Sequence, residues 1–451
     1  MLDRRGYRAQ TPCTRLENSL SFTGRLTDTT RTAPSVPSRW RLALILGAIT
    51  AVGPLSIDMY LPAFPDISVE FSSTAAQVQL TLTACLIGLA FGQLLAGPVS
   101  DALGRRRPLL VGVAVYLIAS LLCAFAPSTT VLVVLRFVQG MAGAAGLVIA
   151  RAVIRDLYTG VAAAKFFSML MLVTGAAPIL APMIGSQLLS FTSWRGVFVI
   201  LAVYGVVMGL AALFSLPDTL PREKRRRGGV KDTLGSFGRL FQDRSFVGYA
   251  LAGGLSFATI FAYVSASPFV LQVVYEVSPQ VYGLLFALNS VGILIFGQVN
   301  GWLVGRVAPR TLLNIGMASS VTASLVLLLL VSTGLFGLPG VMVALFVGVS
   351  SLGLVMPNAT TLALAEYPNA AGAASALLGT LQFLLGALAA PLVSLGGEDT
   401  ALPMALVMAV VSVGALVVYR TMTRPIPAEE QELAAVVTEQ TGAEIAANGV
   451  R

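Results

Sequence analysis

Long runs of hydrophobic residues alternate with short polar segments along most of this chain. A helix needs about 20 apolar residues to cross a bilayer. Because the runs are continuous instead of alternating between polar and apolar positions, they favour helices over a transmembrane barrel. The pattern predicts an all-α membrane protein with twelve transmembrane helices, near residues 42–62, 76–98, 108–126, 130–151, 165–190, 195–216, 246–272, 279–304, 311–332, 339–364, 370–393 and 401–419.

The longest polar interruption, residues 217–244, divides these spans into two sets of six. The segment FGQLLAGPVSDALGRRRPLL at 91–110 has an echo, FGQVNGWLVGRVAPRTLL at 296–313, each at the end of its half's second span. Internal repeats are typical of secondary transporters. We therefore predict two pseudo-symmetric six-helix bundles, 40–216 and 245–420, joined by a cytoplasmic linker, 217–244, with a disordered N-terminal tail, 1–39, and a C-terminal tail, 421–451. Residues 1–38 also faintly resemble a transit peptide, which leaves open whether they belong to the mature protein.

Composition and charge support a multi-pass membrane protein. The chain is 56% hydrophobic and only 11% charged, against about 25% charged residues in a typical soluble domain. If both termini are cytoplasmic, every basic residue except Arg136 and Arg195 lies on the cytoplasmic side or at that membrane surface, as the positive-inside rule requires. The net charge of +8 is then explained by topology and by anionic lipid headgroups, without a nucleic-acid partner.

Several kinds of chemistry are excluded by what the sequence lacks. It has no histidine, and its three cysteines are scattered, so a zinc site, another metal site or a histidine-based triad is not expected. The spans contain no paired carboxylates, which argues against an enzyme. The absence of a phosphate-binding G-x-x-x-x-G-K-[ST] motif implies that a gradient supplies the energy. We expect no cofactor, and proton transfer must use carboxylates.

One carboxylate, Asp58, lies well inside a predicted span. A charge at the centre of a span costs about 2.5 to 3.5 kcal/mol on insertion scales, so it usually faces a cavity or a partner. At 1.5 Å per residue, Asp58 and Arg136 each lie roughly 6 to 9 Å from the outer end of their helix. We predict that Asp58 accepts the proton and that Arg136 modulates it. The alternative is a static ion pair that joins helices 1 and 4.

Four motifs, in order, carry a resemblance to a known family. SIDMYLPAFP (56–65), GPVSDALGRRRPLL (97–110), RFVQGMAGAAG (136–146) and GAAPILAPMIG (175–185) are similar to motifs of the major facilitator superfamily. The first is closest to its twelve-helix drug:proton antiporters of the Bcr/CflA type, and the likeness covers roughly 42–420. The resemblance implies a monomer in the bacterial cytoplasmic membrane that exports small hydrophobic or amphipathic compounds, such as antibiotics, in exchange for protons by alternating access.

The resemblance also implies two conformational elements. A latch would hold helix 2 against helix 11 in the outward-facing state; its residues are Gly97, Asp101, Gly104, Arg105 and Arg106. The alternative is that these arginines only fix the orientation of the protein in the membrane. The second-half echo keeps Arg306 and Arg310 but has Gly305 where an aspartate is expected, so a latch there should be weaker.

The antiporter motif on helix 5 favours export over import, and its residues here are Gly175, Pro178, Pro182 and Gly185. The two prolines should kink or loosen that helix. The motif departs from the family's usual Gly-Pro by having Ala181 before Pro182.

The substrate is less well defined by the sequence. Candidates for the cavity are the polar or aromatic residues Tyr60, Gln139, Tyr263, Asn289, Asn358 and Gln382. For each of them, a hydrogen bond between helices is the competing role. A mainly apolar cavity with one acidic group suits amphipathic, neutral or cationic compounds. A proton-coupled importer of a small metabolite is the alternative function; a membrane-embedded enzyme or a sensor is less compatible with the sequence.

Overall fold

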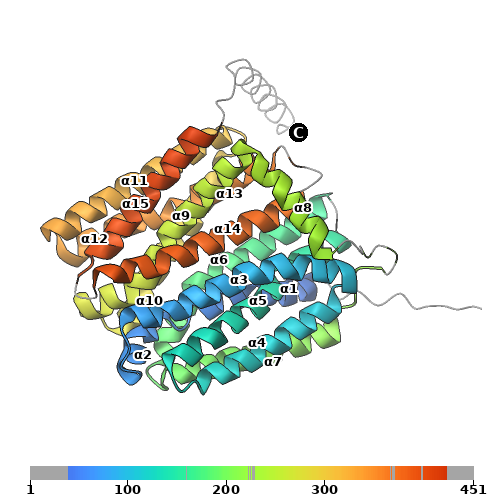
Figure 1. The fold of residues 1–451 in the computed structure, drawn as a ribbon, viewed down its shortest axis with the longest axis horizontal. Helices are drawn as coiled ribbons and strands as arrows, with labels where there is room; N and C mark the ends of the chain where they lie inside the picture. Colours follow the sequence, from blue (N-terminus) through green and yellow to red (C-terminus); the bar gives the residue numbers. More distant parts are fainter. Residues whose placement is uncertain are drawn as a thin grey trace, which may run out of the picture. The chain divides into compact units, whose positions relative to one another are not determined.

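Helices account for nearly all of the chain that the structure, a computed structural model, describes (Figure 1). It describes residues 39–423 except 159, 222, 224, 226–228, 366, 368–370 and 398–399. The predicted tails therefore lie almost wholly outside the described residues. The first half contains α1 (Arg39–Asp58), α2 (Phe64–Glu70), α3 (Ala75–Leu103), α4 (Arg106–Ala124), α5 (Thr129–Leu157), α6 (Gly160–Leu188) and α7 (Trp194–Ser215).

The second half repeats this succession after a helix in the linker. It contains α8 (Gly229–Gln242), α9 (Arg244–Phe269), α10 (Pro279–Leu303), α11 (Pro309–Thr333), α12 (Gly337–Ser350), α13 (Leu352–Leu364), α14 (Ala371–Leu392) and α15 (Leu402–Met422). Eleven helical spans among the described residues are long and apolar enough to cross a membrane, with α1–α2 and α12–α13 each counted as one. The described apolar part of α6, Leu172–Leu188, takes the place of the remaining span, so the predicted twelve-span succession is recovered.

Helix starts follow ordinary capping chemistry. The Thr74 side chain accepts a hydrogen bond from the Gln77 amide while the Gln77 side chain bonds back to the Thr74 amide, which is a complete capping box at the start of α3. Ser128 and Ser278 cap α5 and α10 in the simpler way. These caps place the polar turns between spans where the hydrophobic runs stop.

The linker is more ordered than its polar composition predicts. Gly229–Gln242 forms α8, whose Phe237 and Leu240 are buried with α9 residues such as Phe246. Apolar residues at spacings of three to four occupy one face of such a helix. This amphipathic helix was not predicted from the polar composition of residues 217–244.

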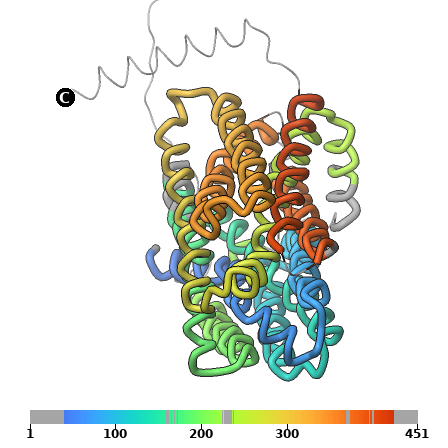
Figure 2. The backbone as a smooth tube through the Cα atoms, turned by 90° about the vertical axis from the view of Figure 1, so that its left-hand side faces the viewer, coloured from blue at the N-terminus to red at the C-terminus, as the bar shows by residue number. Residues whose placement is uncertain are grey.

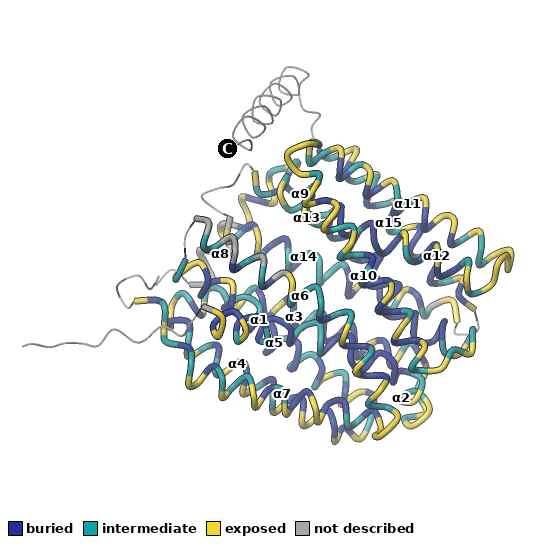
Figure 3. The backbone as a smooth tube through the Cα atoms, turned by 180° about the vertical axis from the view of Figure 1, so that it is seen from behind, coloured by how far each residue is buried: buried dark blue, intermediate teal, exposed yellow. Residues whose placement is uncertain are grey.

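The two halves occupy separate regions of the described bundle (Figure 2). In the first half α3 packs on α5 and α4 on α7, and in the second α9 packs on α14 and α15. Two helix pairs, α3 with α14 and α6 with α10, join the halves. The helices α4, α7 and α11 expose large apolar side chains, including Val111, Leu210 and Leu329. Exposed positions recur along these outer helices (Figure 3). Such a surface suits contact with lipid and would be unfavourable in water.

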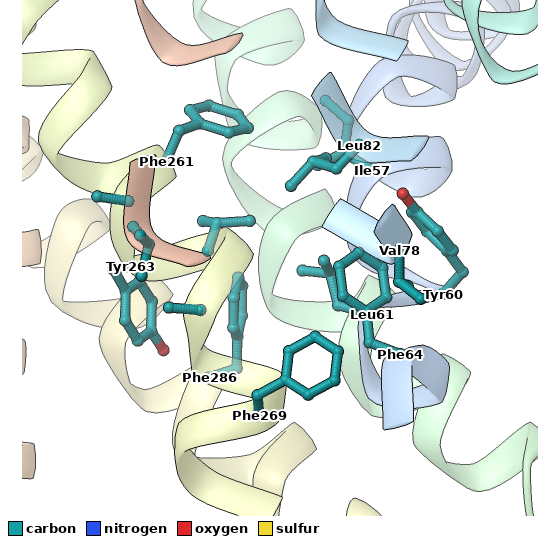
Figure 4. Packing of buried hydrophobic residues seen from close by; sticks show 14 of the residues in the cluster. Ile57, Tyr60, Leu61, Phe64, Val78, Leu82, Phe261, Tyr263, Phe269 and Phe286 are labelled. Atoms are coloured by element: carbon teal, nitrogen blue, oxygen red, sulfur yellow. The ribbon is translucent and has the colours of Figure 1, made fainter. Parts of the chain in front are cut away.

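The buried apolar residues distinguish the two ends of the bundle. At the end where α2 lies, called the α2 end below, one cluster joins both halves and includes Leu61, Phe64 and Phe269 (Figure 4). At the opposite end, near α8 and called the α8 end, separate clusters form around Leu42 in the first half and Phe246 in the second. The halves are thus fused by a continuous core at the α2 end, whereas at the α8 end the contact between α3 and α14 joins two distinct cores.

Candidate functional site

Asp58 is the last residue of α1 and lies at a break inside the first span. In a continuous helix the amide of residue 62 would donate to the Asp58 carbonyl, but Pro62 has no N–H. The chain instead forms a short 3₁₀ turn, Leu61–Ala63, before α2 begins. This proline explains why a predicted uninterrupted helix is divided, and the break places a nearly buried Asp58, 6% exposed, in the protein interior.

Arg136 is wholly buried on α5 and is held by the first half. Its Nη2 donates to the Ser56 carbonyl oxygen at 2.8 Å, and its Nη1 donates to the Gln139 side-chain oxygen. The guanidinium also lies 4.2 Å from the centre of the Tyr60 ring. No carboxylate pairs with Arg136 among the ion pairs of the described residues. Its positive charge is instead stabilised by a carbonyl oxygen, an amide oxygen and an aromatic face.

A polar network in the first half supports the Arg136 side chain. Gln139 Nε2 donates to Ser120 Oγ at 2.7 Å, and Ser120 donates to the Tyr116 carbonyl oxygen. The Tyr116 hydroxyl lies 2.7 Å from Ser56 Oγ. Ser56 is also the residue whose carbonyl oxygen binds Arg136, so the network is closed. Buried polar groups are stable when they are connected in this way.

No ion pair between Asp58 and Arg136 occurs among the described contacts, and their roles in proton coupling stay a prediction. Arg136 reaches the backbone two residues before Asp58, so the two positions do lie at the same level. Direction separates them. Ser56 and Tyr60, four residues apart, both face the first-half interior, where Tyr60 bonds Thr81 at 3.1 Å. Asp58 follows Ser56 by about 200° of helix rotation, so its side chain leaves the other side of the helix.

On that other side lies a polar group of the second half. Asn289 Nδ2 donates to the Tyr263 hydroxyl at 2.9 Å, and the Tyr282 hydroxyl lies 3.2 Å from Ser267 Oγ. Asp58 is near enough for its charge to act on both tyrosines. The Asn289 side-chain oxygen is buried and has no hydrogen-bond partner. A carboxyl group thus lies close to a second-half cluster that has an unused acceptor.

The other cavity candidates separate into different surroundings. Tyr60 and Gln139 belong to the Arg136 network, and Tyr263 and Asn289 to the second-half cluster. Asn358 donates to Asn300 at 2.5 Å and to the Leu354 carbonyl oxygen, which makes it a link between α13 and α10. Gln382 is half-buried on α14. The structure therefore divides four of the six candidates between a first-half and a second-half polar group and assigns Asn358 a bond between helices.

A pocket in the second half is remote from this chemistry. It has a volume of about 920 Å³, lies between α11 and α12, and is lined by apolar residues such as Ala318, Val326, Val343 and Val347. A second pocket of about 20 Å³ lies between α3 and α9 beside Gln79. Neither is lined by Asp58 or by a predicted cavity residue, so the site is defined by side-chain contacts and not by these volumes.

Arg105 is the centre of the predicted latch and is largely buried. It forms ion pairs with Asp101 at 2.5 Å and with Asp156, at the end of α5, at 2.8 Å, and its amide donates to Asp218 in the linker at 2.9 Å. Burial by itself would lower the pKa of Arg105, but the hydrogen bonds to Asp156 and Asp101 raise it. The guanidinium therefore stays charged and joins α3 to α5, while the backbone amide of Arg105 binds the linker.

The partners of the other latch residues also belong to the first half and the linker. Arg106 donates to the Leu213 carbonyl oxygen at 2.6 Å, and Gly97 faces Val148. Gly104 has a φ of +91° beside Asp218. The expected contact between this cluster and the eleventh span, which is α14, is not among the described contacts. α3 meets α14 farther along, where Gln93 lies against Gly379.

The second-half echo repeats the backbone and not the charges. Gly305 has a φ of +86°, similar to Gly104, so both second spans end in a left-handed glycine that is followed by arginine. Arg306 lies 4.4 Å from the Trp302 ring and forms no ion pair among the described contacts. Gly305, where an aspartate was expected, is therefore explained by its positive φ, which favours glycine.

The predicted antiporter motif lies where α6 contacts both α1 and α10. Gly185 packs against the Met59 carbonyl, next to Asp58, so closely that no side chain would fit there. Ser290 of α10 donates to the Pro178 carbonyl oxygen at 3.3 Å, and Gly283 lies against the Pro182 carbonyl. Both prolines are accommodated within one continuous helix, so they do not end α6.

Sequence reasoning missed several residues of the site. Ser56, Tyr116 and Ser120 complete the Arg136 network, and Asp156 and Asp218 complete the Arg105 cluster. Ser56 could have been found from its position four residues before Tyr60 on the same helix face. The others lie far away in the sequence and carry no motif, so only the packing of the helices brings them to the site.

Two pseudo-repeated helical halves, joined around a buried carboxyl, define a secondary membrane transporter, a class of proteins that are not enzymes. The chain belongs to the major facilitator superfamily, whose family model, described as "Major Facilitator Superfamily", matches residues 46–391. No cluster of potential metal ligands occurs in the described part of the chain.

Relatives in other organisms agree with this assignment. The chain is 43% identical to an uncharacterized MFS-type transporter, YdgK, of Bacillus subtilis, over 84% of this chain and 94% of that protein. It is 33% identical to a bicyclomycin resistance protein homolog of Haemophilus influenzae, over 84% and 95%. It is 30% identical to the multidrug resistance protein MdtL of Salmonella heidelberg, over 76% and 85%. These relatives confirm the resemblance to transporters of the Bcr/CflA type.

Solved structures confirm the fold. A D-xylose-proton symporter superposes with a TM-score of 0.68 at 15% identity and covers 85% of this chain and 98% of its own. A bacterial homolog of the human lysosomal transporter Spinster, in an inward-facing conformation, gives a TM-score of 0.67 at 17% identity, over 86% and 99%. At these identities the match concerns architecture alone.

Proposed function

We propose that this transporter exports small hydrophobic or amphipathic compounds, antibiotics among them, in exchange for protons by alternating access. The observation that carries the proposal is a buried carboxyl group, Asp58, at a helix break near the junction of the two halves. Two relatives named for bicyclomycin and multidrug resistance support the substrate class.

Elementary electrostatics gives Asp58 its part in the cycle. A carboxylate that is removed from water without a cation loses its hydration, so burial favours the neutral, protonated form. Contact with water restores the charged form. Because Arg136 is occupied by Ser56 and Gln139, Asp58 has no cation to hold its charge in this state. Alternating burial and hydration would therefore load and release one proton at Asp58.

The distribution of the core gives a direction to this cycle. We infer that the α8 end, with its many arginines, faces the cytoplasm and that the protein resides in the bacterial cytoplasmic membrane with both termini inside. The continuous core at the α2 end then closes the outer side. No nucleic acid, metal or cofactor is required, and the monomer contains both halves of the site.

The test uses inverted membrane vesicles with an imposed proton gradient. Addition of a transported drug should dissipate the gradient in wild-type vesicles, whereas Asp58→Asn, which cannot ionise, should reduce the coupled proton flux at least tenfold at unchanged protein level. Asp66→Asn is the matched control, because Asp66 is an exposed aspartate on the neighbouring α2. Coupled flux that survives in the Asp58 variant would contradict the proposal, and drug movement with the proton gradient would favour the importer.

A further inference from the structure

The Asp58 side chain is directed away from the polar network of the first half. Ser56 and Tyr60 bind first-half partners, Tyr116 and Thr81, on one side of the helix. Asp58, about 200° away from Ser56 around the helix axis, is directed to the opposite side. No hydrogen bond or ion pair of its carboxyl group occurs among the described contacts, although the residue is nearly buried.

The helices α9 and α10 reach this region, because both contact the turn Leu61–Ala63 that follows Asp58. Ile57 and Leu61, which flank Asp58, belong to the same buried cluster as Tyr263 and Phe286 (Figure 4). The Tyr263 ring stacks on Phe286 with centroids 5.5 Å apart, which fixes the plane of the phenol. Asn289 Nδ2 donates to the Tyr263 oxygen, so the Tyr263 hydrogen is not used in that bond and can be donated to Ser267, with which Tyr263 also interacts, or to another acceptor.

Asn289 supplies the complementary group. Its side chain is wholly buried, and its oxygen has no donor. An unpaired buried amide oxygen costs about 1 to 3 kcal/mol. The Tyr263–Asn289 pair thus presents one hydroxyl donor and one free acceptor from adjacent side chains, which is the complement of a neutral carboxylic acid, with its one O–H and one carbonyl oxygen.

We propose that Tyr263 and Asn289 form a receptor for the protonated carboxyl group of Asp58, in which the acid donates to Asn289 Oδ1 and accepts from the Tyr263 hydroxyl. This inference rests on the proposed role of Asp58. The contact joins the halves at the α2 end only while the proton is present, because an ionised carboxylate leaves the Asn289 oxygen without a donor. Tyr263 and Asn289 act as positioning residues that convert protonation into closure of the outer side.

The ionisable groups around Asp58 are consistent with a single switch. From α9 and α10 they are Tyr263 and Tyr282, and from α5 Arg136. Tyr60 from the turn after Asp58, Tyr116 from α4 and Cys85 from α3 lie near Arg136 or Ser56. The adjoining part of α6, Leu172–Leu188, has no ionisable side chain. Since free tyrosine and cysteine titrate at about 10 and 8.5 and arginine higher still, Asp58 is the group among these whose charge is expected to change when the pH is lowered.

The distance between spin labels at the α2 end measures closure directly. Val69 on α2 and Val273 beyond α9 are exposed, on opposite halves, and suitable for cysteine substitution and labelling. In the full-length protein in nanodiscs, without drug, lowering the pH from about 8 to about 5.5 should increase the population with a short distance. Asp58→Asn, whose amide can both donate and accept, should remain short at both pH values.

Two variants test whether Tyr263 and Asn289 are needed for the pH-dependent change in distance. Tyr263→Phe removes one hydroxyl and Asn289→Leu removes the free acceptor, and each should reduce the pH-dependent change at least threefold. Asn358→Leu is the control. Asn358 is also a buried asparagine of the second half, but its side chain binds Asn300 and takes no part in the Tyr263–Asn289 pair. Monodisperse elution of each variant establishes folding, and Asn289→Ser replaces Asn289→Leu if the latter does not elute so.

The outcomes separate this inference from the proposed function. A wild-type pH response in both Tyr263→Phe and Asn289→Leu would overturn the receptor, even where Asp58→Asn abolishes proton flux in vesicles. A wild-type protein whose distances do not depend on pH would also overturn it. A full pH response together with coupled flux in Asp58→Asn vesicles would contradict the proposed function instead.

Discussion

Arg136 shows how a single side chain can be placed without an ionic partner. Its guanidinium uses two nitrogens for the Ser56 carbonyl and the Gln139 amide while its face lies over Tyr60. A planar fork that donates in several directions suits this arrangement, whereas a lysine ammonium is a compact point charge. The residue is therefore expected to fix the end of α1, from which Asp58 projects.

Arg136→Lys tests this reading. The variant keeps the charge but cannot bind both acceptors and stack at once, so the initial rate of drug-dependent proton flux should fall about tenfold, equivalent to about 1.4 kcal/mol. Arg195→Lys is the control, because Arg195 pairs with Glu70 in a half-exposed ion pair at the α2 end, where such pairs contribute little. Equal rates for Arg136→Lys and wild type would show that charge alone suffices.

The sequence predicted the identity and the depth of the central residues better than their directions. Hydrophobic runs located the spans, and counting along them brought Asp58 and Arg136 to one level, as the Ser56 contact confirms. Which way Asp58 points depends on the break at Pro62 and on the first-half partners of Ser56 and Tyr60. Those partners are recruited from α3 and α4 by packing, so no local pattern could reveal that Asp58 faces the second half.

At the scale of elements, close helix contacts determine where the half-to-half junction can form. Gly185 of α6 meets the Met59 carbonyl, and Gly140 of α5 meets the Cys85 carbonyl of α3, each at a distance that leaves no room for a methyl group. Small residues of this kind let membrane helices approach each other. The sequence identified the glycines but not their partner helices, since the same spacing is compatible with any neighbour.

Gly185→Ala should therefore move α6 away from the turn that follows Asp58. Overpacking at such a contact costs about 1 to 3 kcal/mol, so the apparent melting temperature in detergent, read by size-exclusion of the heated protein, should decrease. Gly53→Ala on α1 is the matched control, because nothing lies within 4 Å of the added methyl group there, and it should leave the melting temperature unchanged or slightly raised. A stable Gly185→Ala protein would mean that α6 yields without cost.

At the scale of the whole molecule, the two ends of the linker contact different halves of the protein. Its first part belongs to the first half, because Asp218 binds the Arg105 amide and pairs with Arg225 at 2.7 Å. Its last part, α8, buries Phe237 and Leu240 with the second half. The continuous core at the α2 end and the contacts of α3 with α14 and α6 with α10 join the halves independently of the linker.

Cutting the chain after Arg225 should consequently preserve the transporter. Fragments 1–225 and 226–451 keep the Arg105–Asp218 cluster and α8 intact, so co-expressed fragments should copurify and retain drug-dependent proton flux within about threefold of the uncut protein. The loss would reflect the effective concentration that a linker supplies. A cut after Gly235 is the control, because it divides α8 and separates Phe237 from the preceding turn. Equal losses for the two cuts would mean that the linker acts as a tether and that its attachment to each half contributes nothing.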